Sequence, residues 1–494
     1  MNKKRLTDIL LKNMVVIMFV ILCVGATIAS KQPLTFVIPE LFTRIARNSF
    51  IVLALIIPVI AGMGLNFGIV IGAMAAQIAL FLTTYWGLTG IFGFLVTAAL
   101  ATPLAVFFGF LVGKLFNKMK GNEMIGGLVL GYFAEGFYQL IFLFIFGGVI
   151  KLNNSTLMIP TGVGVKNTID LKDTIKYALD TVPMLTIVEI GFYLVLIGIV
   201  CSVLLRMAKK QTVNWKNTGA AVALAAAVYA LTFIGPVEQF LAADRLLLLY
   251  AVELWCLYMI FSSVFRFVKW KLNQKKNAGE AVGVRSQFNK NKAMANILLA
   301  VVVYALTYVP VLYKVLLAVK LPVMTYLCIG ALCIFNNVLM KTRLGQNMRT
   351  VGQSRTVANA AGIDVDKTRI IAMIFSTVLA SWGQLIFLQN VGTLSTYGAH
   401  TQVGQFAIAA LLVGGASVQK ATNKQALLGI VLFHTLFIVS PLAGKELFGD
   451  PVIGEYFRVF VSYGVIAMAL AMHAWKKPVK AKEVKDGKAE MKTA

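Results

Sequence analysis

The run TGIFGFLVTAALATPLAVFFGFLVG, residues 89–113, contains 25 residues and no charged side chain. A helix of about 20 mostly apolar residues is long enough to cross the roughly 30 Å hydrocarbon core of a bilayer. This run therefore predicts one membrane-spanning helix, and the rest of the chain repeats the pattern.

The composition of the whole chain points the same way. Of its 494 residues, 59% are hydrophobic and 13% are charged, whereas about a quarter of the residues in a soluble globular protein are charged. A soluble enzyme is excluded on this ground. Thirteen further apolar runs occur at residues 14–30, 48–64, 68–83, 124–150, 183–206, 217–235, 243–265, 294–313, 321–340, 370–388, 405–419, 425–441 and 456–474. We expect an all-α, polytopic transmembrane helical bundle with about fourteen spans.

The position of the basic residues predicts how the spans are oriented. The net charge is +26, which in a soluble protein would suggest nucleic acid as a partner. Here the Lys and Arg residues gather in alternate loops, at 114–120, 206–216 and 266–292, and in the tail 476–494. Because cytoplasmic loops of membrane proteins are enriched in Lys and Arg, we expect both termini in the cytoplasm, membrane lipid as a partner, and no nucleic acid.

One basic stretch lies on the opposite side of this pattern. The segment PELFTRIARNS, residues 39–49, carries Arg44 and Arg47 ahead of an apolar run. Its amphipathic character predicts a helix lying flat in the membrane interface.

Neither a metal site nor a nucleotide site is predicted. The five cysteines all fall in apolar runs, and the three histidines are far apart without metal-ligand spacing. The segment GFLVGK, residues 109–114, has one residue too few between its glycines for a phosphate loop. We expect no cofactor on this chain, so any ATP that drives it must be hydrolysed by another chain.

A glycine-rich segment interrupts the continuous apolar sequence. GMGLNFGIVIGAMAAQ, residues 62–77, places Gly64, Asn66 and Gly68 within it. Glycines in this setting serve close helix packing or a break in the helix. A break at membrane depth is tolerated where it lines a cavity, so a substrate path is the functional alternative to plain packing.

Three glutamates lie within predicted spans, where ionisable residues are costly and commonly functional. They are Glu135, Glu189 and Glu253. Glu135 is the strongest candidate for a substrate path, because Tyr132, Tyr138 and Gln139 flank it; a pairing between helices is the alternative.

The polar loop 341–369 is too regular for a simple linker. Val357, Ala358, Ala360 and Ala361 offer a helix face of small residues, and Gly362 is a natural helix C-cap. Such a helix fits a groove on another protein. A solvated basic loop is the alternative.

At this loop the chain resembles a known family. TRLGQNMRTVGQSRTVANAAGIDVDKTRIIA, residues 342–372, is similar to the coupling region of permease subunits from ABC importers of ribose-type sugars, nucleosides and branched-chain amino acids. Ser354 and Arg355 depart from the pattern, where an Asn-Pro pair is common. The resemblance implies that the following residues couple to the ATPase: Thr342, Arg343, Gly345, Arg349, Gly352, Ala358, Ala360, Ala361 and Gly362.

Other segments resemble the same family in the expected order. AIAALLVGGASV, residues 407–418, is similar to its Gly-Gly signature with Gly414, Gly415 and Ser417, and LNFG, residues 65–68, to its broken-helix segment. GNEMI, residues 121–125, resembles the nucleoside branch, whereas Val70 stands where that branch often has an acidic residue. The resemblance thus places Gly414, Gly415 and Ser417 in the substrate path, with a nucleoside or simple sugar as the favoured substrate.

The resemblance also suggests a division of the chain. Such permeases have about ten spans, so about four are extra here. We expect an N-terminal permease half at 1–206, inserted spans with a basic loop at 207–320, a C-terminal half at 321–475, and a basic cytoplasmic tail at 476–494.

The implied function is solute transport across the bacterial inner membrane, without chemistry on the solute. The implied partners are cytoplasmic ATPase subunits that carry ATP and Mg, a second permease copy or homologue, and an extracellular substrate-binding protein. Two alternatives remain: an ion-coupled secondary transporter that uses the membrane glutamates, and a membrane scaffold or lipid-processing protein.

Overall fold

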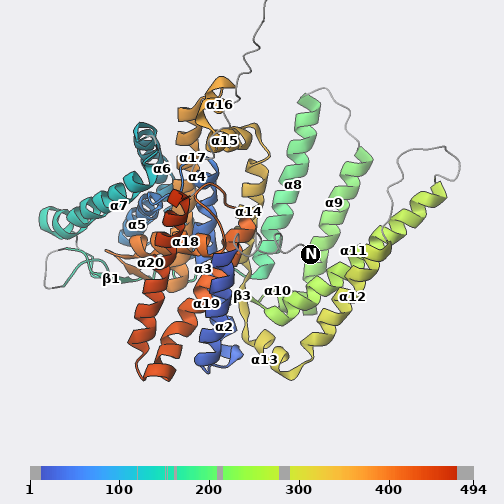
Figure 1. Cartoon of the computed structure of the whole chain (residues 1–494). Helices are drawn as coiled ribbons and strands as arrows, with labels where there is room; N and C mark the ends of the chain where they lie inside the picture. The colour runs from blue at the N-terminus through green and yellow to red at the C-terminus, as the bar shows by residue number, and fades with distance from the viewer. Residues whose placement is uncertain are drawn as a thin grey trace, which may run out of the picture.

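The computed structural model describes residues 13–119, 121–150, 152, 154–160, 164–208, 215–276 and 290–475, and most of them are helical (Figure 1). The predicted cytoplasmic ends, 1–12 and 476–494, lie outside these ranges, as do residues 277–289 of the basic loop. The helices are α2 (Met14–Ala29), α3 (Leu34–Ala54), α4 (Ile56–Ile60), α5 (Ile69–Tyr85), α6 (Gly90–Lys118), α7 (Glu123–Leu140), the π-helix η1 (Ile141–Val149), α8 (Met184–Ala208), α9 (Trp215–Ala230), the 3-10 helix η2 (Leu231–Phe233), α10 (Gly235–Leu241), α11 (Leu248–Lys276), α12 (Lys290–Thr307), α13 (Pro310–Ala318), α14 (Val323–Leu339), α15 (Arg343–Gln353), α16 (Arg355–Ala360), α17 (Val365–Val391), α18 (Ala399–Val413), α19 (Asn423–Phe448) and α20 (Pro451–Trp475).

Two short antiparallel ribbons tie distant parts of the chain together. β1 (Thr168–Asp170) pairs with β4 (Thr393–Ser395), and β2 (Arg245–Leu247) pairs with β3 (Lys320–Pro322). The second ribbon joins the two ends of the segment that contains α11, α12 and α13.

The described residues form a helical membrane bundle. Seven helices are long and apolar enough to cross a bilayer, or ten when each of three bent pairs counts as one span. Three shorter apolar helices, α2, α5 and α18, accompany them. The total of fourteen spans and the orientation in the membrane stay predictions.

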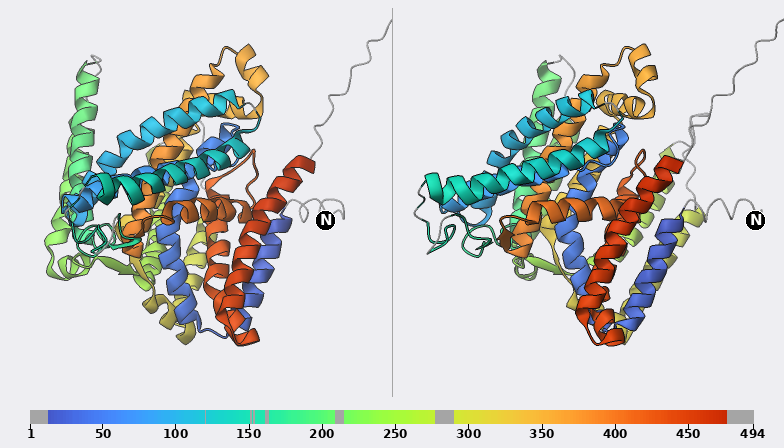
Figure 2. Two further views of the ribbon diagram at one scale, coloured as in Figure 1. Left: turned by 90° about the vertical axis from the view of Figure 1, so that its left-hand side faces the viewer. Right: turned by 60° about the vertical axis from the view of Figure 1, so that its left-hand side comes forward.

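The core of the bundle is built around α17, which packs against α3, α5 and α6, while α19 packs against α3 and has α2 and α20 beside it (Figure 2). Small residues permit the close approach. A Cβ on Gly109 of α6 would lie 2.8 Å from the Cα of Ile374, and one on Gly113 would lie 2.9 Å from the Cα of Ile370. The glycines of the GFLVGK segment therefore serve helix packing.

The segment 39–49 differs from the expectation of a helix lying flat in the interface. It is part of α3, which continues into α4 as one candidate span, Leu34–Ile60. The charges can enter the bundle because Glu40 accepts a hydrogen bond from Nε of Arg44 at 2.9 Å, one helical turn away. The amide of Asn48 in turn donates to the carbonyl of Arg44 at 2.9 Å.

Helices α8, α9, α11 and α12 stand apart from the core and make most of their contacts in the pairs α8–α9 and α11–α12 (Figure 1). Large apolar side chains on them are exposed, among them Leu194, Leu224, Phe261 and Leu298. Apolar faces of this kind suit contact with lipid. These helices contain most of the expected insertion, 207–320, although the division into permease halves stays a prediction.

Candidate coupling region and solute path

The loop 341–369 folds into two short helices because three side chains cap successive helix starts. The hydroxyl of Thr342 accepts from the N–H of Gly345 at 3.2 Å and begins α15, and that of Ser354 accepts from Val357 at 3.3 Å and begins α16. Asp364 caps α17 in the same way. Between α16 and α17, Gly362 adopts φ +75°, which suits glycine at a helix end.

The structure divides the predicted ATPase-coupling residues between the surface and the interior. Gly345 and Ala358 are buried, and Gly352 is half-buried. Ala358 packs against Val351 and Val365, so it holds α16 onto its neighbours. The exposed members are Thr342, Arg343, Arg349, Ala360, Ala361 and Gly362. The end of α16 thus presents an outward face of small residues, Ala360, Ala361 and Gly362, and Ala358 is not part of it.

A concavity of about 470 Å³ lies beside this face, between α15 and the start of α17. It lies at an exposed end of the molecule (Figure 1), and polar and small residues line it together with Leu344, Ile363 and Ile371. Those residues include Arg343, Asn347, Ala361, Gly362, Asp364 and Lys367. The concavity and the outward face together offer a shaped surface for another protein.

The two residues that depart from the family pattern both have roles here. Ser354 is the cap of α16, and the guanidinium of Arg355 forms an ion pair with Glu123 at the start of α7. The same carboxylate accepts from Nη2 of Arg369 at 2.5 Å. Glu123 and Arg369 have side-chain exposures of 6% and 1%. This buried carboxylate joins α7, α16 and α17. Glu123 is part of the GNEMI segment, but the sequence did not indicate a role for it.

A break in the helix, one of the two alternatives for the glycine-rich segment, is present. α4 ends at Ile60 and α5 begins at Ile69, and between them Gly62 and Gly64 adopt φ +74° and +70°. We call residues 61–68 the break segment. A Cβ on Gly352 of α15 would lie only 2.0 Å from the carbonyl oxygen of Ile60. The backbone of α15 therefore rests directly on the break segment.

The break segment also contacts α7 and the turn between α18 and α19. A Cβ on Gly64 would lie 3.0 Å from both Met124 and Val418, and one on Gly127 would lie 3.2 Å from the backbone nitrogen of Gly68. The break segment is therefore the point where α15, α7 and the α18–α19 turn meet.

The Gly-Gly signature shapes that turn. A Cβ on Gly414 would lie 1.8 Å from the carbonyl oxygen of Gln425 in α19, so the two helices touch there. Gly415 adopts φ +83°, and the hydroxyl of Ser417 accepts from the N–H of Lys420 at 3.1 Å. Two of the predicted path residues, Gly414 and Gly415, thus have clear structural roles.

Asn66 is fully buried within the bundle. Its amide nitrogen lies 3.3 Å from the hydroxyl oxygen of Ser376 in α17, to which it donates, and that hydroxyl donates to the carbonyl of Ala54 at 3.3 Å. The side chain thereby joins the break segment to α17 and the end of α3.

Glu135 does not lie at this meeting point. It is half-buried on α7, two turns beyond the contact of Gly127, and accepts from the amide of Gln139 at 3.3 Å. Glu189 and Glu253 are half-buried on α8 and α11. Among the residues with described side chains, no ion pair involves any of the three.

A second group of polar side chains lies inside the bundle, and sequence reasoning largely missed it. Gln77 of α5, Gln384 of α17 and His400 of α18 are fully buried, and their side-chain nitrogens and oxygens have no hydrogen-bond partner within the described part of the chain. The ring of His400 lies 5.0 Å from that of Tyr138, whose hydroxyl is likewise unpaired. Gln77 and Gln384 each lie in a largely apolar stretch of sequence, which does not indicate that their helices meet.

Such groups need an explanation, because a buried polar group without a partner costs roughly 1–3 kcal/mol of stability. Most buried polar groups in proteins are hydrogen-bonded for this reason. Unpaired amide and imidazole groups on three adjoining helices are suited to hydrogen-bond a polar solute.

An apolar multi-helix bundle, a capped pair of surface helices and a break segment beneath them define a membrane permease component. The chain belongs to the family described as "Branched-chain amino acid transport system / permease component", which matches residues 198–470. It is a multi-pass protein of the inner membrane.

The chain is also similar to the xylose transport system permease protein XylH of Haemophilus influenzae, with 26% identity over 209 residues. The match covers 42% of this chain and 52% of that relative, so the chain spans about half the length of the curated relative it matches. No solved structure matches this chain.

Proposed function

We propose that this chain is the transmembrane subunit of an ATP-driven importer that moves a small polar solute unchanged across the inner membrane. ATP and Mg would be bound by separate cytoplasmic ATPase subunits. A simple sugar or a nucleoside is the favoured solute. Family membership supports the permease role, and the similarity to a xylose permease favours a sugar.

One observation carries the proposal: the backbone of α15 at Gly352 directly touches the backbone of the break segment at Gly62. An ATPase that holds the outward face of α16 and the adjoining concavity would displace α15 as it binds ATP. Because no flexible side chain lies between Gly352 and Ile60, that displacement would pass directly to residues 61–68. The left-handed glycines of the break segment then supply the backbone freedom for a hinge.

The solute would be bound by the unpaired groups inside the bundle. Gln77, Gln384 and His400 offer both donors and acceptors, and Tyr138 adds a hydroxyl and a ring face. This combination suits a sugar or a nucleoside, because hydroxyl groups donate and accept and flat apolar faces stack on rings. The exposed apolar surface of the bundle leaves room for a second permease, and an extracellular binding protein would deliver the solute.

Ion-coupled transport has less support. It would use Glu135, Glu189 and Glu253, but these half-buried residues are on three different helices. Within the described part of the chain, Glu135 alone of the three has a side-chain hydrogen bond, and its partner Gln139 is on the same helix.

The test is to purify the tagged chain from its native membrane and to measure both its partners and solute uptake. We expect an ATPase subunit to copurify. Ala360→Glu, which places a charge on the outward face of α16, is expected to abolish ATP-dependent uptake while the chain remains in the membrane. Ala360→Ser keeps the residue small and is the matched control. Full uptake by Ala360→Glu, or uptake that an uncoupler abolishes while ATP is maintained, would contradict the proposal.

A further inference from the structure

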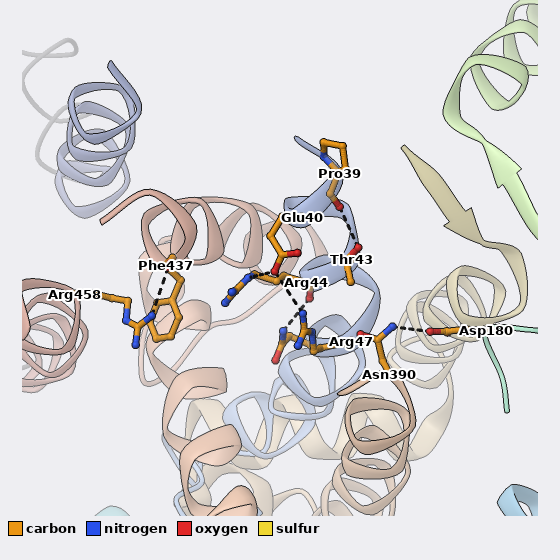
Figure 3. Close-up of polar contacts among 10 residues, drawn as sticks. Pro39, Glu40, Thr43, Arg44, Arg47, Asp180, Asn390, Phe437 and Arg458 are labelled. Atoms are coloured by element: carbon orange, nitrogen blue, oxygen red, sulfur yellow. Dashed lines mark hydrogen bonds and ion pairs between the residues drawn. The ribbon is translucent and has the colours of Figure 1, made fainter. Parts of the chain in front are cut away.

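A cavity of about 240 Å³ lies away from the break segment, at the junction of α3, the loop before α8, the β2–β3 ribbon and the end of α17. Figure 3 shows part of its wall, with Arg47 of α3 next to Asn390 of α17, whose amide reaches Asp180. The lining residues are Thr43, Arg47, Tyr177, Asp180, Arg245, Lys320, Pro322, Asn390 and Val391.

The cavity is lined by three cationic side chains and one carboxylate. Nε of Arg47 and Nε of Arg245 are buried without a hydrogen-bond partner among the described residues. Among the described residues each guanidinium forms a long ion pair, Nη2 of Arg47 with Glu40 at 3.7 Å and Nε of Arg245 with Asp244 at 4.0 Å. The donor capacity of these guanidinium groups is therefore not used up by the chain itself.

The hydrogen bonds of Asp180 come from neutral side chains rather than from these cations. One of its oxygens accepts from the hydroxyl of Thr325 at 2.6 Å and the amide of Gln389 at 3.0 Å, and the other accepts from the amide of Asn390 at 2.6 Å. Both oxygens of the carboxylate thus accept hydrogen bonds from uncharged donors. Within the described part of the chain it forms no ion pair with Arg47, Arg245 or Lys320.

The backbone at Tyr177 holds an unusual conformation at this place. Its φ is +56°, a left-handed value that is uncommon for an aromatic residue and tends to be retained at functional sites. The conformation places its ring 5.7 Å from Cζ of Arg245 and 5.6 Å from Nζ of Lys176. Tyr177 therefore lies next to two cationic side chains, those of Lys176 and Arg245.

We propose that this cavity binds an oxyanion, a phosphate or carboxylate group carried by a small molecule. Guanidinium groups match the geometry of both anions. The volume equals that of about eight water molecules, at roughly 30 Å³ each, which accommodates one such group and its nearest atoms. The lining comes from five separate segments, so an anion there would also tie the β2–β3 ribbon to α3 and α17.

Thermal unfolding of the purified full-length protein in a nonionic detergent tests the proposal, with inorganic phosphate as the probe and chloride at equal ionic strength as the reference. We expect phosphate to raise the unfolding temperature in a saturable way. Arg47→Gln and Arg245→Gln should each weaken phosphate binding about tenfold or more, because each removes a charge-assisted hydrogen bond. If Arg47→Gln does not fold, Lys320→Gln replaces it as the test, because Lys320 lines the cavity from an exposed position. Lys320→Gln should also weaken phosphate binding.

Arg44→Gln is the matched control, because Arg44 is on the same helix and has the same charge but does not line the cavity. It should bind phosphate like the unaltered chain. An equal response in all four variants, or an equal response to chloride, would show a general salt effect and overturn the proposal.

Nanodiscs distinguish the source of the anion. If phosphatidylglycerol removes the effect of added phosphate while phosphatidylcholine alone does not, a lipid headgroup occupies the site. If phosphate acts equally in both, the ligand is a free small molecule. If phosphate has no effect in either, and Arg47→Gln instead lowers the affinity for the extracellular binding protein, the cavity receives an acidic side chain and the proposal is wrong.

Discussion

The backbones of Gly62 and Gly352 are in direct contact: a Cβ on Gly62 would lie 2.6 Å from the Cα of Gly352. The two residues are on the break segment and on α15, which are 290 residues apart in sequence. Their contact joins the surface helices to the transmembrane bundle without an intervening side chain.

Gly352→Ala tests that contact. A methyl group at this position would lie 2.0 Å from the carbonyl oxygen of Ile60, so α15 must move away from the break segment. We expect uptake to be lost and stability to fall by about 1–3 kcal/mol, as for other overpacked sites. Thermal unfolding and uptake assays measure the two effects. Gly330→Ala is the control, because a Cβ on Gly330 of α14 has open space around it; similar losses in both variants would refute the contact's role.

Glu123→Gln is expected to cost about 3–5 kcal/mol, the usual effect of removing one member of a buried ion pair, because Arg369 would remain buried without its carboxylate. A lower unfolding temperature in detergent would show this. The double variant Glu123→Met with Arg369→Met should recover much of the lost stability, since the fully buried charge of Arg369 is removed and the half-buried Arg355 can still reach water. If the single variant is as stable as the unaltered chain, the carboxylate does not hold α7, α16 and α17 together.

Asn66→Leu tests whether Asn66 in the break segment serves solute transport or only the structure. The hydroxyl of Ser376 keeps its bond to Ala54 in this variant, and the unpaired oxygen of Asn66 is removed. Stability should therefore change by less than about 1 kcal/mol. We expect uptake to fall while the ATPase still copurifies; a chain that no longer assembles would instead assign Asn66 a structural role.

Gln384→Leu should leave stability unchanged or raise it, because its buried amide has no partner to lose. Solute uptake should nevertheless fall at least tenfold if Gln384 binds the solute. Gln389→Leu is the contrasting variant on the same helix: its amide donates to Asp180 at 3.0 Å, so stability should drop. Normal uptake in Gln384→Leu would remove this residue from the solute path.

Much of the helical framework follows from hydropathy alone, because each helix must bury or present an apolar surface of fixed length. The break after Ile60 was also predictable, since glycines at 62, 64 and 68 within an apolar run weaken a helix. The predicted helix C-cap at Gly362, where φ is +75°, is a local feature too. These predictions succeed because the deciding residues are close together in the sequence.

The remaining features depend on helix rotation and on distant partners. Ala358 and Ala360 are equally small, yet one is buried and the other exposed. An isolated residue such as Gln77 in an apolar run does not reveal whether an amide partner faces it. The cavity at Arg47 is assembled from five segments, which no local pattern connects.

The central position of α3 has a consequence for the order of synthesis. Ser376, which donates to the carbonyl of Ala54 at the end of α3, follows it by 322 residues. At about 5–20 residues per second, α3 waits roughly 15–60 s in the membrane before α17 exists. During that time its own turn must compensate the charge of Arg44, and Glu40 is the residue placed to do so. The pair of Glu40 and Arg44 can therefore form within α3 alone, before the distant helices of the bundle exist.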